Sequence, residues 1–172
     1  MKAHFQMFAD YNKWANERLY ETATLLSDED RKLDRGVFFG SLHNTLNHLL
    51  VGDLFWMHRF TGTGRKPAAL NECLHDDFEE LRADRAIEDQ RIIDHVGGLS
   101  NADLSGFIEY ARVGQTTKLR QNRAEALAHF FNHQTHHRGQ CHALLTGFGV
   151  TTPGFDLLFY QRELETGVPV LS

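Results

Sequence analysis

The stretch that indicates how this chain folds lies in its second half: His133-Gln134-Thr135-His136-His137-Arg138-Gly139-Gln140. It belongs to residues 122–149, whose hydrophobic spacing predicts one long helix. His133 and His137 are four residues apart, so a helix places them one turn apart on the same face, with about 6 Å between their Cβ atoms. Two imidazoles at this spacing can bind one metal ion.

The face of the helix that carries these two histidines is otherwise apolar, which indicates that it points into the protein. Its members recur every three or four residues: Ala126, Phe130, His133, His137, Cys141, Leu144 and Phe148. A buried imidazole needs a hydrogen-bonding partner, and two side by side need a shared one, which a divalent cation provides. The alternative is that eleven histidines produce some pairs at this spacing by chance. A single inward histidine is more often a hydrogen-bonded core residue than a ligand.

Neighbouring histidines and polar residues in the same stretch are weaker candidates for a ligand. His129 extends the row, but it lies about 12 Å from His137 along the helix axis, too far for both to bind one ion. His136 flanks the row. Cys141 shares the stripe and reads as a buried core cysteine. Arg138 points away from the stripe, which favours a packing or interface role.

Composition limits the kind of protein this can be. The chain has 172 residues, of which 41% are hydrophobic and 24% charged, as in an ordinary globular domain with a real core. Its net charge is −5 and it has no long basic run, which argues against nucleic-acid binding. No apolar stretch is long enough to span a membrane, and no signal peptide is evident. Two cysteines without a secretion signal favour reduced thiols in the cytoplasm.

The hydrophobic pattern predicts an all-α fold. Four long helices are expected, over residues 4–26, 41–60, 76–96 and 122–149. Alternating residues on both sides of Val113-Gly114-Gln115 predict a short hairpin within 105–121. Residues 155–165 are expected to form a short final helix and 166–172 an extended tail. The sequence therefore predicts a four-helix bundle with an inserted hairpin, as a single domain over residues 1–172.

The helix expected over 41–60 is apolar nearly all round, so it should be the most buried. A catalytic zinc-type site needs three protein ligands, so this helix must be searched for the third one. It offers His43, His48, His58 and Asp53. Spacing leaves these alternatives open, with a preference for His48 because Gly52, one turn further on, leaves space beside it. His43 and His58 read as solvated or capping residues, and Asp53 reads equally well as a buried acceptor that orients another group. The long loop over 61–75 is expected to border the site.

Several other metal chemistries are excluded by the sequence. The zinc-protease motif H-E-x-x-H is absent, as are paired C-x-x-C zinc signatures. A di-iron bundle needs two E-x-x-H motifs, and the chain has only the one formed by Glu72 and His75, in an expected loop.

Two motifs resemble a known family. They are Asn47-His48-Leu-Leu-Val-Gly-Asp53-Leu-Phe-Trp56-Met-His-Arg59-Phe60 and Asn132-His133-Gln-Thr-His136-His137-Arg138-Gly139-Gln140. Together with residues 8–16 they resemble the DinB-like (DinB/YfiT) metalloenzyme superfamily, over nearly the whole chain. The resemblance implies a four-helix bundle, often a homodimer, with one divalent metal ion bound by three histidines. Carried over to this chain, these are His48, His133 and His137. The family name refers to DNA-damage induction.

The resemblance also implies a function, because characterised relatives include thiol-dependent transferases and hydrolases that use low-molecular-weight thiols. We expect a metal-dependent enzyme acting on a small molecule, in which the ion activates a water or a thiol. Asp53, His136 and Gln140 are candidates for orienting groups or proton transfer, although Gln140 also reads as a helix-surface amide. The alternative is a non-catalytic metal-binding or stress-response protein with a structural ion. Zinc and nickel are the first expectations for the metal, with iron, copper and manganese as alternatives.

Overall fold

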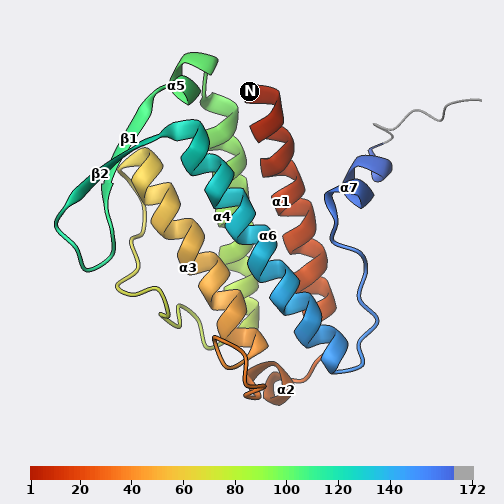
Figure 1. The fold of residues 1–172 in the computed structure, drawn as a ribbon. Helices are drawn as coiled ribbons and strands as arrows, with labels where there is room; N and C mark the ends of the chain where they lie inside the picture. The colour runs from red at the N-terminus through yellow and green to blue at the C-terminus, as the bar shows by residue number, and fades with distance from the viewer. Residues whose placement is uncertain (165–172) are drawn as a thin grey trace, which may run out of the picture.

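Four long helices lie side by side along most of the length of the molecule in the computed structural model, which describes residues 1–164 (Figure 1). In chain order the elements are α1 (Lys2–Ala23), α2 (Asp28–Lys32), α3 (Leu42–Thr61), α4 (Phe78–Gly98), α5 (Asn101–Ser105), β1 (Phe107–Ala111), β2 (Lys118–Asn122), α6 (Arg123–Gly147) and α7 (Leu157–Glu163). The predicted bundle, hairpin and final helix are confirmed. The five-residue helix α5 was not predicted, because one turn is too short to show a hydrophobic period. The tail expected over 166–172 lies outside the described residues.

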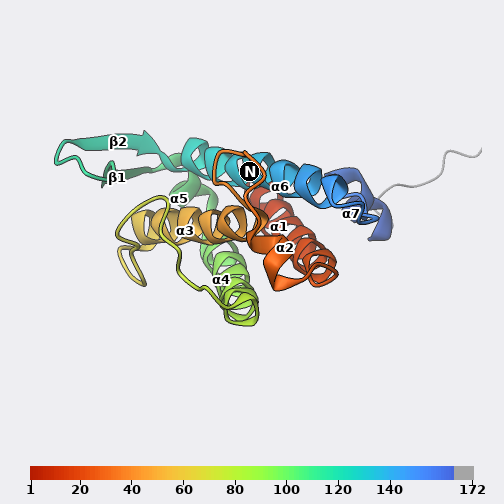
Figure 2. The same cartoon turned by 90° about the horizontal axis from the view of Figure 1, so that it is seen from below.

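The order of the helices around the bundle brings α3 and α6 together. Each of α1 and α3 packs against both α4 and α6 (Figure 2). Helices α3 and α4 run in the same direction in Figure 1, so residues 62–77 must return along the bundle to begin α4 near the start of α3. Helix α3 has 20 residues and is therefore about 30 Å long. Residues 62–77, if extended, are long enough to span that distance. The long loop is therefore a consequence of the topology, and it lies beside α3.

Side-chain caps fix where the helices that carry the histidines begin. Ser41 precedes α3 and its Oγ accepts a hydrogen bond from the backbone N–H of Asn44 at 3.1 Å. Asn122 precedes α6 and accepts from the backbone N–H of Glu125 at 3.2 Å. Each cap satisfies an N–H group that the first turn of a helix leaves unpaired. Helix α3 ends at Gly62, whose φ of 71° is a left-handed conformation that glycine adopts without strain.

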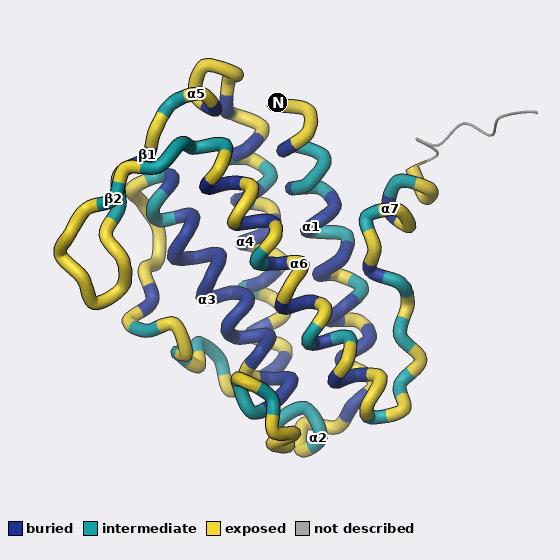
Figure 3. The backbone as a smooth tube through the Cα atoms, viewed as in Figure 1, coloured by how far each residue is buried: buried dark blue, intermediate teal, exposed yellow. Residues whose placement is uncertain are grey.

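Helix α3 is the most buried element, as its sequence predicted (Figure 3). Sixteen of its twenty residues are buried, so every polar side chain on it must find a partner inside the protein. Within residues 1–164, no helix combines the length and apolar character needed to cross a bilayer.

Two large apolar clusters fill the bundle, and a third, smaller one packs α7 against α1. A buried polar layer separates the two large clusters along the helix axes. One cluster surrounds Leu46 and Leu145 near α2, and the other surrounds Met57 and Phe130 near α5. We call the layer between them the polar layer: Asn12, Asn16, Asp53, Arg85, Asp89, Gln134 and Arg138.

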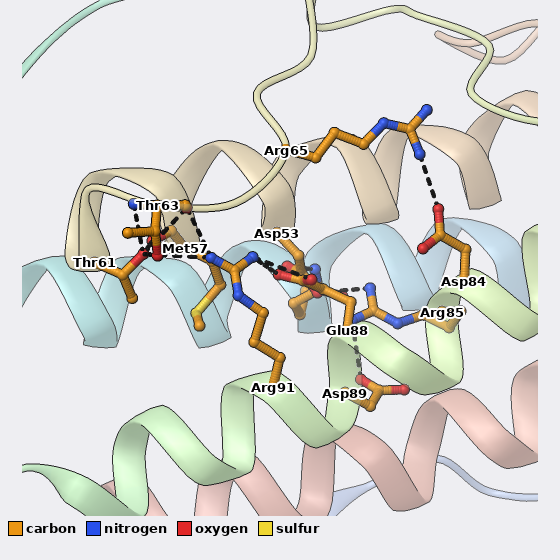
Figure 4. A network of polar contacts seen from close by, with 11 residues as sticks. Asp53, Met57, Thr61, Thr63, Arg65, Asp84, Arg85, Glu88, Asp89 and Arg91 are labelled. Atoms are coloured by element: carbon orange, nitrogen blue, oxygen red, sulfur yellow. Dashed lines mark hydrogen bonds and ion pairs between the residues drawn. The ribbon is translucent and has the colours of Figure 1, made fainter.

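Arg85 of α4 is the central cation of the polar layer. Its guanidinium lies 2.6 Å from Asp53 of α3 and 3.1 Å from Asp89 of α4, and all three residues are at most 2% exposed. Figure 4 shows this pairing, together with the more exposed contacts that Arg91 and Arg65 make nearby. Burial raises the pKa of Asp53 to about 7, and the charge of Arg85 opposes that rise.

Candidate metal centre

The side chains of His48, His133 and His137 converge between α3 and α6. The Nε2 atom of His137 lies 3.2 Å from Nε2 of His48 and 3.1 Å from Nε2 of His133. All three residues offer nitrogen atoms within 4.8 Å of one another. His133 and His137 meet because they are one turn apart on α6, and His48 meets them because α3 packs against this face of α6. We call these three residues the histidine triad.

Hydrogen bonds at the opposite ring nitrogens fix the tautomers of two triad members. Nδ1 of His48 lies 2.8 Å from the carbonyl oxygen of Leu70, and Nδ1 of His137 lies 2.8 Å from Oε1 of Gln140. Both oxygens are acceptors, so both Nδ1 atoms donate, and each Nε2 atom carries a lone pair. Two lone pairs 3.2 Å apart repel each other unless a proton or a cation lies between them.

This donor set fits a divalent ion such as zinc. Nitrogen ligands lie about 2.0–2.1 Å from zinc, so two of them on a tetrahedron are about 3.3 Å apart, close to the separations in the triad. Burial lowers the pKa of His48 and His137 below the ordinary histidine value. Burial and the neighbouring imidazoles lower the pKa of His133 to about 3. Neutral imidazoles are the form that binds a metal.

Gly52 provides the space in which the His133 ring lies. A Cβ atom placed on Gly52 would lie 3.0 Å from Cε1 and 3.4 Å from Nδ1 of His133. The sequence suggested that this glycine makes room beside His48, but the ring that fills the space belongs to the facing helix. The absence of a side chain on α3 therefore lets an imidazole of α6 approach the helix backbone.

Replacing Gly52 by alanine should weaken metal binding by about 10-fold, because the His133 ring must shift by a few tenths of an ångström away from its present position. The measurement is a competition titration of the metal-free protein against a chromophoric chelator. Gly139→Ala is the matched control, since nothing lies within 4 Å of a Cβ at that position of α6. It should leave the affinity unchanged and stabilise the helix by up to about 1 kcal/mol. Equal affinities for the two variants would contradict the role assigned to Gly52.

A cavity of about 750 Å³ opens beside the triad, and His48 and His137 form part of its wall. Phe39 covers the triad from the segment before α3: its ring stacks on His48 with 3.9 Å between ring centroids and meets His137 edge-on at 5.6 Å. Leu70 and Cys73 of the loop over 62–77 also line the cavity. The loop therefore borders the site, as expected, and a small molecule has access to the histidines.

The candidate residues Gln140 and His136 form a short chain of contacts that ends at the surface. Gln140 accepts from Nδ1 of His137, and its amide nitrogen lies 3.2 Å from Nε2 of the exposed His136. Gln140 is therefore placed to orient His137, and His136 to orient Gln140. A role for either residue in proton transfer stays a prediction.

Asp53 lies in the polar layer, where its described partners are Arg85 and Gln134. Gln134 also donates to the carbonyl oxygen of Leu49 at 3.2 Å. Gln134 directly follows His133 on α6, so this hydrogen bond links α6 to α3 next to a member of the triad. The contacts of Asp53 match a buried acceptor that orients another group, and its role in catalysis stays a prediction.

Three further histidines had been considered as ligands, and the surroundings of two of them differ from the prediction. His43 is 1% exposed, and its Nε2 donates to the carbonyl oxygen of His75 at 2.9 Å, so the prediction of a solvated or capping residue is wrong. The reason is that the loop over 62–77 folds back over the start of α3. His58 is half-buried, with a buried Nδ1, so it is not freely solvated either. His129 is exposed and packs against Trp56, and although its ring centroid lies 6.0 Å from that of His133, it is not part of the triad.

Two further predictions about α6 hold. Cys141 is fully buried in the core, and burial raises the pKa of its thiol. Arg138 is 2% exposed and donates to Asn12 of α1, which is a packing role.

A second group of possible ligands, His43, Cys73 and Asp76, lies together near the loop, but the Nε2 atom of His43 is already a donor to a backbone carbonyl.

Sequence reasoning missed several residues that shape the site. Gln134 had a usable signal, because it lies one helical turn after Phe130, a member of the inward-facing stripe. Phe39 had a weaker one, as part of an apolar pair in a connector. The carbonyl group of Leu70 had none, because only the path of the loop brings it to His48.

Comparison with known proteins places this arrangement in a family. The chain is 26% identical over 167 residues to protein DinB of Bacillus subtilis (strain 168), covering 91% of this chain and 94% of that one. Its fold is similar to the crystal structure of a DinB-like protein from Bacillus cereus ATCC 10987, with a TM-score of 0.62, 17% identity, and coverage of 86% of this chain and 94% of the other. The model of the DinB family matches residues 1–167, and the chain belongs to the DinB family.

Proposed function

We propose that this protein is a metal-dependent enzyme that binds one divalent ion, zinc or nickel, through His48, His133 and His137. We further propose that it joins a low-molecular-weight thiol through its sulfur to a small electrophile, which loses its leaving group while the thiol releases its proton, or that it hydrolyses that electrophile. One observation carries the proposal: the Nε2 lone pairs of His48 and His137 face each other at the wall of an accessible cavity.

A divalent ion held by neutral imidazoles supplies Lewis acidity that makes a thiol or a water molecule nucleophilic near neutral pH. The residues of the chain supply orientation and shielding. The Leu70 carbonyl group and Gln140 hold the rings of His48 and His137 in the tautomers that a ligand needs. Phe39 shields the ring of His48 from water. Asp53 acts at a distance, by holding Gln134 beside His133.

The cavity supports an enzyme better than a structural metal site. A structural site has a closed shell of four protein ligands. Here three histidines cluster within residues 1–164 without a fourth His, Cys, Asp or Glu ligand, and two of them form part of the wall of an open cavity. The preference for a thiol over other substrates rests on the resemblance to thiol-dependent members of the DinB-like superfamily.

The test begins with the untagged protein loaded with zinc or nickel, assayed for coupling of cysteine to a chromogenic aryl chloride and for hydrolysis of a nitrophenyl ester. We expect multiple turnovers in one assay, loss of turnover after chelation, and recovery when the metal is restored. Helicity by circular dichroism should change little on chelation, because the apolar clusters and the polar layer do not include the triad.

One control concerns Cys73, which is exposed at the cavity wall and could itself react with the aryl chloride. Cys73→Ser separates such a single alkylation from turnover. Turnover that survives complete metal removal would contradict the proposal. A metal-free protein that unfolds outright would instead support a structural ion in a non-catalytic protein.

A further inference from the structure

A second cavity, of about 540 Å³, lies between the C-terminal end of α3, the first part of the loop over 62–77, and the β1–β2 hairpin. In Figure 1 the hairpin projects beside the end of α3, and the loop leaves α3 below it. We call this cavity the basic groove, because its wall carries Arg59, Lys66, Arg112 and Lys118 and also His58. Among the residues that the structure describes, Glu109 is the only acidic one in its wall, and in the hairpin register it lies directly opposite Arg120.

The four cations of the basic groove have no carboxylate partner within residues 1–164. Arginines elsewhere on the described surface form ion pairs, for example Arg18 with Glu163 at 2.7 Å and Arg65 with Asp84 at 3.0 Å. The chain has a net charge of −5, so acidic side chains are not scarce. Gathering unpaired cations around one concave surface costs electrostatic free energy, which an anionic ligand would recover.

Arg59 is held in a fixed position at the inner side of this groove. Its guanidinium lies 4.6 Å from the ring centroid of Trp56, 4.7 Å from that of Tyr110 and 5.9 Å from that of Phe55. The side chain is half-buried, and among the described residues it donates no hydrogen bond. A guanidinium clamped by aromatic rings keeps its planar fork of N–H donors free, and this fork matches a carboxylate or a phosphate.

We propose that the basic groove is an anion-binding site that takes the carboxylate or phosphate group of a small molecule, with Arg59 as the bidentate donor and Lys66, Arg112 and Lys118 as surrounding charges. The volume suits a small molecule. An extended nucleic-acid surface would need a longer basic stripe than one groove offers. The site is separate from the triad, although the loop over 62–77 contributes to the walls of both cavities.

The test is an NMR titration of the 19.7 kDa protein with inorganic phosphate and, separately, with succinate, to distinguish the two kinds of anion. We expect saturable shifts of amides around residues 58–68 and 109–118, reduced by added salt. Arg59→Gln should weaken binding by about 10-fold or more, as expected for loss of a charge-assisted bidentate contact. The double variant Lys66→Gln/Arg112→Gln changes only exposed residues, so it tests the site even if Arg59→Gln folds poorly.

The matched control is Arg82→Gln, which removes the same charge from an exposed position of α4, outside the groove. It should bind both anions as the unaltered protein does. The titration is repeated with His133→Ala, in which loss of most of the metal from the triad should remove its contribution to phosphate binding. Absence of saturable binding to either anion, equal weakening by Arg82→Gln, or loss of binding in His133→Ala would each overturn the proposal. Binding of a DNA duplex without binding of either small anion would also overturn it.

Discussion

Replacing His133 or His137 by alanine should reduce the metal content of the purified protein from about one ion per chain to well below stoichiometric. Each variant removes one of three nitrogen ligands, and the remaining two cannot enclose the ion. The loss of affinity should exceed the roughly 10–100-fold that follows from changing only the hydrogen-bond partner of a metal ligand. Elemental analysis of untagged protein measures the effect, since a histidine tag would bind metal itself.

The matched control for these variants is His129→Ala, which removes an exposed imidazole from the same helix one turn before His133. It should retain the full metal content. Full occupancy in both His133→Ala and His137→Ala would exclude the triad as the metal site. It would leave the anion site untouched, because the basic groove shares none of these residues.

Replacing Arg85 by methionine should lower the free energy of unfolding by about 3–5 kcal/mol, the usual cost of removing one partner from a buried ion pair. The variant leaves the carboxylates of Asp53 and Asp89 in the core without their cation. Urea denaturation followed by circular dichroism measures the loss. Arg82→Met is the control: this arginine lies on the same helix but is largely exposed, 3.9 Å from the exposed Glu79. Its removal should cost less than about 0.5 kcal/mol.

The deficit of Arg85→Met should also grow as the pH rises above about 7. Burial raises the pKa of Asp53 from 3.8 to about 7 even with Arg85 present, and loss of the arginine raises it further. Below about pH 7 both folded proteins hold a proton on Asp53 that the unfolded chain releases, so their stabilities fall in parallel as the pH rises. Above about pH 7 only the folded variant still holds this proton, so its stability continues to fall while that of the unaltered protein levels off. A deficit no larger than that of Arg82→Met, or one independent of pH, would show that the polar layer does not depend on Arg85.

The sequence determined the helices and half of the site, because both depend on local spacing. The apolar period of residues 122–149 predicted α6, and the same period placed His133 and His137 on its inner face. The nearly uniform apolar character of α3 predicted its burial, and alternation around Gly114 predicted the hairpin. Two motifs indicated the family and, through it, His48.

Only the tertiary structure decided which groups from distant parts of the chain meet. The packing of α3 against α6 brings His48 to the triad and lets the His133 ring lie over Gly52. The return of residues 62–77 along the bundle, which follows from the parallel course of α3 and α4, brings the Leu70 carbonyl to His48 and buries His43. Hydrophobic spacing reports which side of a helix is buried, but not which helix it faces. Loop paths, tautomers and ion pairs between helices depend on which helix each buried side faces. That pairing is determined by how all four helices pack together.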